Sequence, residues 1–243
     1  MSASSKALRR LASIAAVAAI LAAHAAAAQG PRDPNNPTCP VNPNWSSYRQ
    51  MRFTVHERPG QRPVLLAEGM IDDNLIPRLR EAVRNFQGDE VWLRSPGGNA
   101  RIGNQAGQII RRSDLQTRIP AGWACFSACN FLFMGGIVRF VDPGGLFIVH
   151  MFTYTADREA IRGEMSVSED RATRLINGIE QGSAMLASED NVFLVGMGVA
   201  PSLLTDVMYR VPVASGPQGR ETRRCLTQEQ IRRYNVATRF ISG

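Results

Sequence analysis

Lysine and histidine are both scarce in this chain of 243 residues. Lys6 is the only lysine, so a lysine amine is excluded as a general base in everything that follows the first few residues. Of the three histidines, His24 lies in the N-terminal apolar region, which leaves only His56 and His150. Any reaction that depends on an imidazole therefore has two candidates for its base.

Several other patterns are missing. No Gly-rich P-loop occurs, which argues against ATP chemistry in this chain. No basic run with interleaved aromatic residues occurs, and the arginines are scattered among acids. Such mixing is typical of a solvated surface, so we expect no nucleic-acid partner. No apolar run after the first thirty residues is long enough to span a membrane.

Residues 1–28 have the form of a secretory signal peptide. Lys6, Arg9 and Arg10 precede an apolar run at 11–23, and small residues at 26–28 precede Gln29. Cleavage there would lower the formal charge from +7 to +4, which leaves 25 arginines against 21 acids. We expect export to the periplasm or secretion. The alternative is an uncleaved membrane anchor, although the run is short for a span of about twenty residues.

The rest of the chain is predicted to form one domain. Residues 29–50 are rich in proline and asparagine and are expected to form an extended lead-in. Residues 51–243 are enough for a single sizeable core, in agreement with a hydrophobic content of 44%.

All four cysteines follow the predicted signal, where an oxidising compartment allows them to pair. Cys39 and Cys225 lie in the two terminal segments and could tie them together. Cys125 and Cys129 flank Ser127 and could pair across a turn. Three connectivities are open, and the sequence does not choose among them. No metal site is expected, because the cysteines lack a second cluster of ligands.

Apolar periodicity predicts an α/β fold. Strands are expected at 62–70, 90–93, 116–119 and 146–150, and helices at 75–86, 102–112, 128–135, 166–194 and 201–209. Asp72 and Asp73 are expected to cap the first helix. Strands separated by helices imply a mostly parallel sheet covered on both sides.

Three local features together indicate a serine hydrolase. The turn 95–98 (Ser-Pro-Gly-Gly) follows a predicted strand, Ser127 precedes a predicted helix, and His150 ends a predicted strand. Ser127 needs a base to lose its proton, and His150 is the candidate because the other histidine precedes the α/β core. The N–H groups of Gly98 and of Ala128, at a helix start, can stabilise an oxyanion.

The segment 64–152 resembles the proteolytic subunit of Clp protease, within the Clp/crotonase superfamily. The matching motifs lie at 69–73, 95–98, 103, 127–128, 135–136, 139 and 147–150. The sequence Cys-Phe-Ser-Ala-Cys at 125–129 resembles exported Clp-like proteins that carry Cys-x-Ser-Ala-Cys. The resemblance implies a ClpP/crotonase-like spiral of β-β-α units with a mostly parallel sheet flanked by helices. It also implies Ser127 as nucleophile, His150 as base, and Gly98 with Ala128 as the oxyanion hole.

This sequence departs from the family's pattern at the third member of the catalytic triad. Where the resemblance places the family's aspartate, this chain has Val199 and Ala200. The nearest acids are Glu189, Asp190 and Asp206, and we favour Asp206 because its segment resembles the one that bears the family's acid.

The sequence therefore predicts an exported, ATP-independent serine peptidase that acts on peptide or protein substrates through an acyl-enzyme and needs no cofactor. Coenzyme A is not expected as a ligand outside the cytoplasm. The alternatives are a catalytically degenerate scaffold or binding protein, and a peptidase with Cys125 or Cys129 as nucleophile. Segment 154–182 takes the place of the handle through which Clp-like subunits form rings, so a homo-oligomer is a candidate assembly.

Overall fold

The computed structural model describes residues 31–33, 36–150, 158–209 and 223–239. The predicted signal peptide, 1–28, lies outside the described residues. Within the described ranges no helix is both long enough and apolar enough to cross a lipid bilayer.

The core is built on a five-stranded sheet in the order β3-β4-β5-β6-β8. Its strands are β3 (Arg52–His56), β4 (Val64–Glu68), β5 (Glu90–Arg94), β6 (Gln116–Ile119) and β8 (Arg139–Val141). From β4 to β8 every neighbouring pair is parallel, whereas β3 runs antiparallel to β4 at the edge. The prediction of a mostly parallel sheet is confirmed. The sequence did not reveal β3, because its residues are mostly exposed and lack a buried face.

A smaller sheet carries the strands that lead to the candidate site. Its order is β10-β9-β7, with β7 (Ala124–Phe126) parallel to β9 (Leu146–Val149) and β10 (Arg224–Cys225) antiparallel to β9. All four residues of β9 are buried, as expected for a central strand flanked on both sides. An isolated bridge between Ser95 and Cys125 joins the two sheets just beyond the end of β5.

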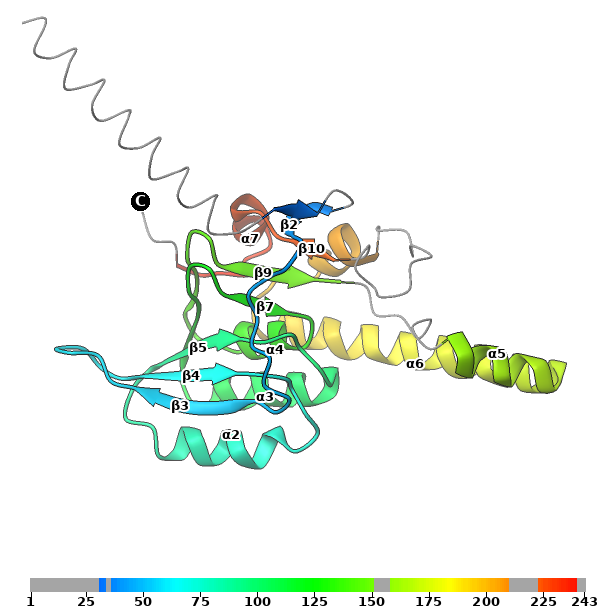
Figure 1. Ribbon diagram of the computed structural model, residues 1–243, viewed down its shortest axis with the longest axis horizontal. Coiled ribbons are helices and arrows are strands. Elements are labelled where there is room, and N and C mark those ends of the chain that lie inside the picture. The colour runs from blue at the N-terminus through cyan, green and yellow to red at the C-terminus, as the bar shows by residue number, and fades with distance from the viewer. Residues whose placement is uncertain (1–30, 34–35, 151–157, 210–222, 240–243) are drawn as a thin grey trace, which may run out of the picture.

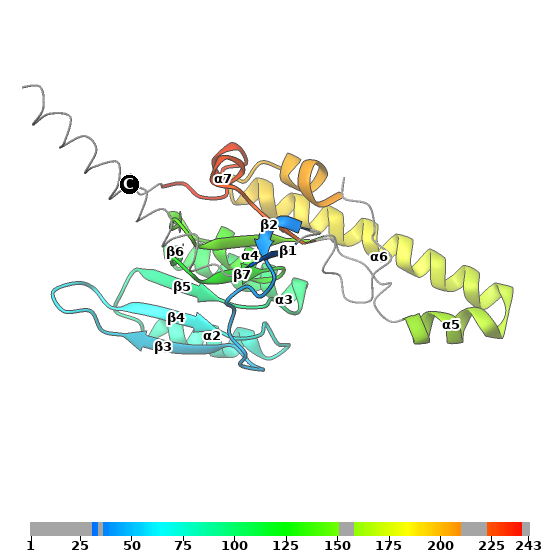
Figure 2. The same ribbon diagram turned by 45° about the horizontal axis from the view of Figure 1, so that its top comes forward.

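Helices surround these sheets (Figure 1). They are α2 (Leu75–Arg84), α3 (Ala100–Arg112), α4 (Cys129–Met134), α5 (Arg158–Val167), α6 (Glu169–Gly196), the π-helix η1 (Leu204–Tyr209) and α7 (Gln228–Arg233). Figure 2 shows that α5 and α6 form a hairpin that extends away from the sheets. The single helix predicted over 166–194 was wrong at its start, because Ser168 separates α5 from α6 and caps α6 by accepting a hydrogen bond from the Arg171 N–H.

The predicted cap of the first helix was also wrong. Helix α2 begins after Asn74, and no side chain caps it. Asp72 instead accepts hydrogen bonds from the N–H groups of Met51 and Asn74 and pairs with Arg78. Burial raises the pKa of Asp72, but the hydrogen bond and charge of Arg78 outweigh it, so the pKa is lowered. Asp72 therefore links the residue before β3 to helix α2.

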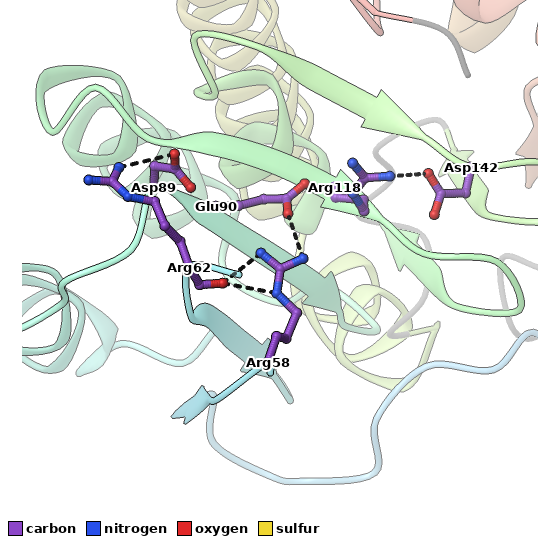
Figure 3. Close-up of polar contacts among 6 residues, drawn as sticks. All are labelled: Arg58, Arg62, Asp89, Glu90, Arg118 and Asp142. Atoms are coloured by element: carbon purple, nitrogen blue, oxygen red, sulfur yellow. Dashed lines mark hydrogen bonds and ion pairs between the residues drawn. The ribbon is translucent and has the colours of Figure 1, made fainter. Parts of the chain in front are cut away.

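A charged network links β5, β6 and the residue that follows β8 (Figure 3). Glu90, the first residue of β5, pairs with Arg118 of β6 at 2.6 Å and with Arg58 at 3.9 Å, and Arg118 also pairs with Asp142. Burial lowers the pKa of Arg118, but these two carboxylates outweigh it and raise the pKa. At the opposite end of β5, Arg94 pairs with Glu68 of β4 at 2.6 Å, and the strand leads into the Ser95–Gly98 turn.

Two disulfides are formed, Cys39–Cys225 and Cys125–Cys129. The first joins β2 (Asn36–Pro40), which pairs with the short β1 (Arg32–Asp33), to β10. It therefore holds the lead-in against the C-terminal part of the chain. The second spans the turn that carries Ser127.

Candidate active site

Ser127 occupies a strained turn between β7 and α4. Its φ angle is +57°, a left-handed conformation that is unfavourable for a residue with a side chain. Strained turns of this kind are enriched at functional sites, and a serine between a strand and a helix resembles the turn that exposes the nucleophile in α/β-hydrolases. The strain is a signal that sequence patterns did not contain.

His150 immediately follows β9, and its imidazole contacts the candidate nucleophile. The distance from Nε2 of His150 to Oγ of Ser127 is 2.7 Å, a good hydrogen bond. Because β7 and β9 are parallel neighbours, the residues that follow them lie at the same edge of the sheet. His56 lies elsewhere, exposed at the end of β3 and opposite Val64, the first residue of β4.

Aromatic side chains fix the position of the imidazole. The ring of Phe126 lies 4.8 Å from that of His150, and the ring of Trp45 stacks on Phe126 at 5.5 Å. Trp45 belongs to the predicted lead-in, whose Asn44 carbonyl accepts a hydrogen bond from Ala124 at the start of β7. The lead-in therefore helps to build the site, a role that the sequence did not indicate.

Two backbone N–H groups point to where an oxyanion could bind. Among the described residues, the N–H groups of Gly98 and Ala128 have no hydrogen-bond acceptor. Gly97 packs closely against the start of α4, because a Cβ added to it would lie 2.7 Å from Cβ of Ser127 and 3.0 Å from N of Ala128. Gly97 and Gly98 have φ angles of +85° and +145°, which glycine adopts readily. The turn thus lies directly against the Ser127 turn.

Asn130 was not predicted to belong to the site, yet it connects its two halves. Its Nδ2 donates to the carbonyl oxygen of Ile148 at 2.7 Å, and the N–H of Ser127 donates to the same oxygen at 3.2 Å. Both sides of the Ser127 turn are therefore held to β9, the strand that His150 follows. The disulfide between Cys125 and Cys129 closes the same turn, so neither sulfur is a free thiol and the cysteine-nucleophile alternative is excluded in this state.

A cavity of about 60 Å³ opens beside Ser127 and His150. Its walls are mostly apolar, with contributions from Ala100, Ala128, Phe131, Met134, Phe147, Val149, Leu186, Leu194, Leu203 and Leu204. Besides Ser127 and His150, its polar lining consists of Asn130 and Asp190. Burial, together with the neighbouring charge of Glu189, raises the pKa of Asp190 to about 7.

Asp206 lies on η1 and is not among the residues that line this cavity. Its carboxylate accepts a hydrogen bond from the Tyr234 hydroxyl at 3.3 Å and pairs with Arg233 at 3.7 Å. The structure thus brings Ser127, His150, Gly98 and Ala128 together and places Asp206 beside the end of α7. Of the three acids weighed from the sequence, Asp190 is the one that reaches the cavity.

Comparison with known proteins bears on the fold. No protein-family model matches the sequence, and no curated protein matches it. Among solved structures, a point mutant of ClpP1 from Listeria monocytogenes aligns with a TM-score of 0.51 and 12% identity, over 74% of this chain and 91% of that chain. The predicted fold class is confirmed: the chain is an α/β protein of mostly parallel sheets and helices, similar in structure to ClpP.

Proposed function

We propose that this protein is a serine peptidase in which Ser127 is the nucleophile and His150 the general base. The observation that carries the proposal is the 2.7 Å contact between Oγ of Ser127 and Nε2 of His150. A hydroxyl at this distance from an imidazole can pass its proton to Nε2 as it attacks a carbonyl carbon. The two unpaired N–H groups of Gly98 and Ala128 support the same reaction.

The chemistry proceeds in two halves. Oγ of Ser127 bonds to the peptide carbonyl carbon, its proton moves to Nε2 of His150, and the carbonyl electron pair moves onto oxygen. The N–H groups of Gly98 and Ala128 donate to that oxyanion, at the start of α4 where the helix dipole also favours negative charge. The carbonyl then re-forms, the C–N bond breaks, and the imidazolium gives its proton to the leaving amine.

The same residues then hydrolyse the resulting acyl-enzyme, with water in place of the leaving amine. Water loses a proton to His150 and attacks the ester carbon, after which Ser127 recovers its proton and the new carboxylic acid leaves. No cofactor enters these steps. The proposal includes export, so that the two disulfides form in an oxidising compartment and the substrates are peptides or proteins found there.

A degenerate scaffold is the second candidate. It is favoured by the position of Asp206, whose described contacts are with Tyr234 and Arg233. In the best-studied triads the acid holds the imidazole in its productive tautomer, and its loss lowers the rate strongly. A scaffold of this kind would keep the fold and bind peptides without cleaving them.

Labelling with a fluorophosphonate separates the two candidates. The oxidised protein without residues 1–28 is treated with the probe beside Ser127→Ala and His150→Ala, and intact mass is measured. Labelling of the unsubstituted protein alone is expected, because only an activated serine displaces the fluoride. Absence of labelling in both oxidised and reduced protein would reject the peptidase and favour the scaffold.

A further inference from the structure

The cavity beside Ser127 contains hydrogen-bond acceptors that no described residue satisfies. Asp190 is only 8% exposed, and among the described residues no donor or cation pairs with its carboxyl group. Asn130 is 6% exposed, and its Oδ1 is buried without a partner. Buried polar groups of this kind are normally paired, so two in one small cavity call for an explanation.

The orientation of the Asn130 amide is fixed by its neighbour. Nδ2 faces the carbonyl oxygen of Ile148, which can only accept, so turning the amide over would place two oxygens against each other. Oδ1 is therefore the acceptor left over. A ligand that satisfies both residues must bring donors to Oδ1 and to the carboxylate of Asp190.

The charge of the missing partner follows from Asp190. The described acids and bases nearest to it do not pair with it. Glu189 is acidic and is itself paired with Arg101 at 3.5 Å on the exposed side of α6, and His150, across the cavity, contacts Ser127. An unpaired carboxylate in an apolar cavity is unfavourable, and a cation that enters the cavity removes that penalty. The ligand class is thus a cationic donor.

The size and walls of the cavity narrow the class further. A single water molecule needs roughly 10–15 Å³ of cavity volume, so a cavity of about 60 Å³ accepts a chain of about five heavy atoms. A lysine side chain has that size. Its methylene groups would contact Leu186, Leu194 and Leu203, while its ammonium would reach the polar lining.

We propose that the cavity selects a substrate residue with a cationic side chain, lysine above all, next to the bond that is cleaved, with Asp190 as its counter-charge and Asn130 Oδ1 as a second acceptor. This inference rests on the proposed peptidase function, because it assigns the specificity of the same site. Asp190 would then be a specificity-determining residue and not the acid that orients His150.

The test uses matched peptidyl diphenyl phosphonates whose residue next to phosphorus is lysine, norleucine or glutamine. Oγ of Ser127 bonds to phosphorus, and phenol leaves with the serine proton by way of His150. At pH 8 we expect the lysine probe to label the protein at least tenfold faster than norleucine. Asp190→Asn should reduce that ratio at least tenfold. Glu189→Gln, which removes an equal charge one residue away on the outer side, should leave it within about twofold.

Failure of the inference is separable from failure of the proposed function. The protein could react with a fluorophosphonate and yet react with the lysine phosphonate no faster than with the norleucine or the glutamine phosphonate. That result would reject the cationic cavity and leave the proposed peptidase function intact. If no phosphorus probe reacts, binding to the cavity is measured directly. We would titrate n-butylammonium into Ser127→Ala and follow the NMR signals of the Asn130 side-chain amide. Saturable binding that Asp190→Asn abolishes supports the inference, and its absence, or equal binding of n-butanol, overturns it.

Discussion

The main-chain N–H of Ser127 donates to the carbonyl oxygen of Ile148 at 3.2 Å, two residues before His150. This bond ties the turn after β7 to the end of β9, and it explains why the hydroxyl and the imidazole meet although 23 residues separate them. The turn must reverse sharply to make the bond and still start α4. Its left-handed backbone at Ser127 is the consequence.

The strain at Ser127 predicts an unusual order of stability. A left-handed conformation costs a residue with a side chain about 1–2 kcal/mol, and glycine escapes most of that cost. Ser127→Gly should therefore unfold at higher urea concentration than Ser127→Ala, by about 1 kcal/mol in free energy of unfolding. Ala128, with φ of −57°, is the control: Ala128→Gly should destabilise the protein. If Ser127→Ala were more stable than Ser127→Gly, the backbone at this position would not be strained.

The two disulfides are predicted to separate stability from activity. Cys39 and Cys225 close a loop with a sequence separation of 186, worth about 5 kcal/mol, whereas Cys125 and Cys129 are 4 apart, worth about 2 kcal/mol. Replacing the first pair by alanine should lower Tm by about 10–20 °C, and the second by about 4–8 °C. The rate of Ser127 labelling should show the opposite order, with the larger effect on loss of the Cys125–Cys129 bridge.

At a temperature where all variants are folded, loss of the Cys125–Cys129 bridge should slow fluorophosphonate labelling about tenfold, because the turn loses its clamp. Loss of the Cys39–Cys225 bridge should slow it less than threefold. Calorimetry and the time course of intact mass give the two readouts. Equal effects of both pairs on labelling would show that the short bridge does not position Ser127.

The sequence predicted much of this fold because buried elements carry strong periodicity. The continuous apolar run of β9 and the helical spacing of α2 are recognisable in the sequence, and the scarcity of histidine makes His150 the candidate base. Elements with weak patterns were missed: β7 has only three residues, and β3 is mostly exposed. Their place is set by pairing with distant strands and not by local pattern.

The parts of the site that were missed depend on tertiary contacts. Trp45 stacks on Phe126 from a segment that reads as a proline-rich lead-in, and nothing in its local sequence indicates that contact. Asp206 was preferred to Asp190 because its segment resembles the one that bears the family's acid. Tertiary packing decides which face of the 28-residue helix α6 meets the cavity, and that face carries Asp190. Exposed apolar residues along that helix, such as Met185 and Val192, blur its periodicity.

The raised pKa of Asp190 predicts how stability depends on pH. The carboxyl group has a pKa of about 7 in the folded protein against an ordinary value of 3.8, so between these values the folded state holds a proton that the unfolded state has lost. Stability therefore falls as pH rises from about 4 to 7 and then levels off. Asp190→Asn removes this dependence and should be more stable above pH 7, by at most about 4 kcal/mol.

Urea unfolding at pH 4.5, 6 and 8 measures that difference. The titratable groups near Asp190 are Glu189, which pairs with Arg101, and His150 across the cavity; only Glu189 carries a charge that shifts the pKa of Asp190, so Glu189→Gln is the control. Glu189→Gln should lower the pKa of Asp190 and so flatten the pH dependence only in part. A constant difference between Asp190→Asn and the unsubstituted protein at all three pH values would show that Asp190 is not titrating in this range.

Gly98 provides the sharpest test of the oxyanion hole. A Cβ at this position would lie 2.2 Å from the carbonyl oxygen of Ile71, which is backbone and cannot rotate away. Ile71 also receives the N–H of Asn99, and its own N–H donates to the carbonyl of Gly97, so the turn has to shift as a unit. Such a shift moves the Gly98 N–H away from Ser127.

Gly98→Ala should slow fluorophosphonate labelling at least 100-fold, since loss of one oxyanion donor costs about that factor in related chemistry. Gly122→Ala is the matched control, because Gly122 also has a positive φ, of +78°, but an added Cβ meets nothing within 4 Å. Both variants carry the backbone strain, and only Gly98→Ala adds the clash beside Ser127. Equal labelling rates for the two would mean that the Gly98 N–H takes no part in stabilising the oxyanion.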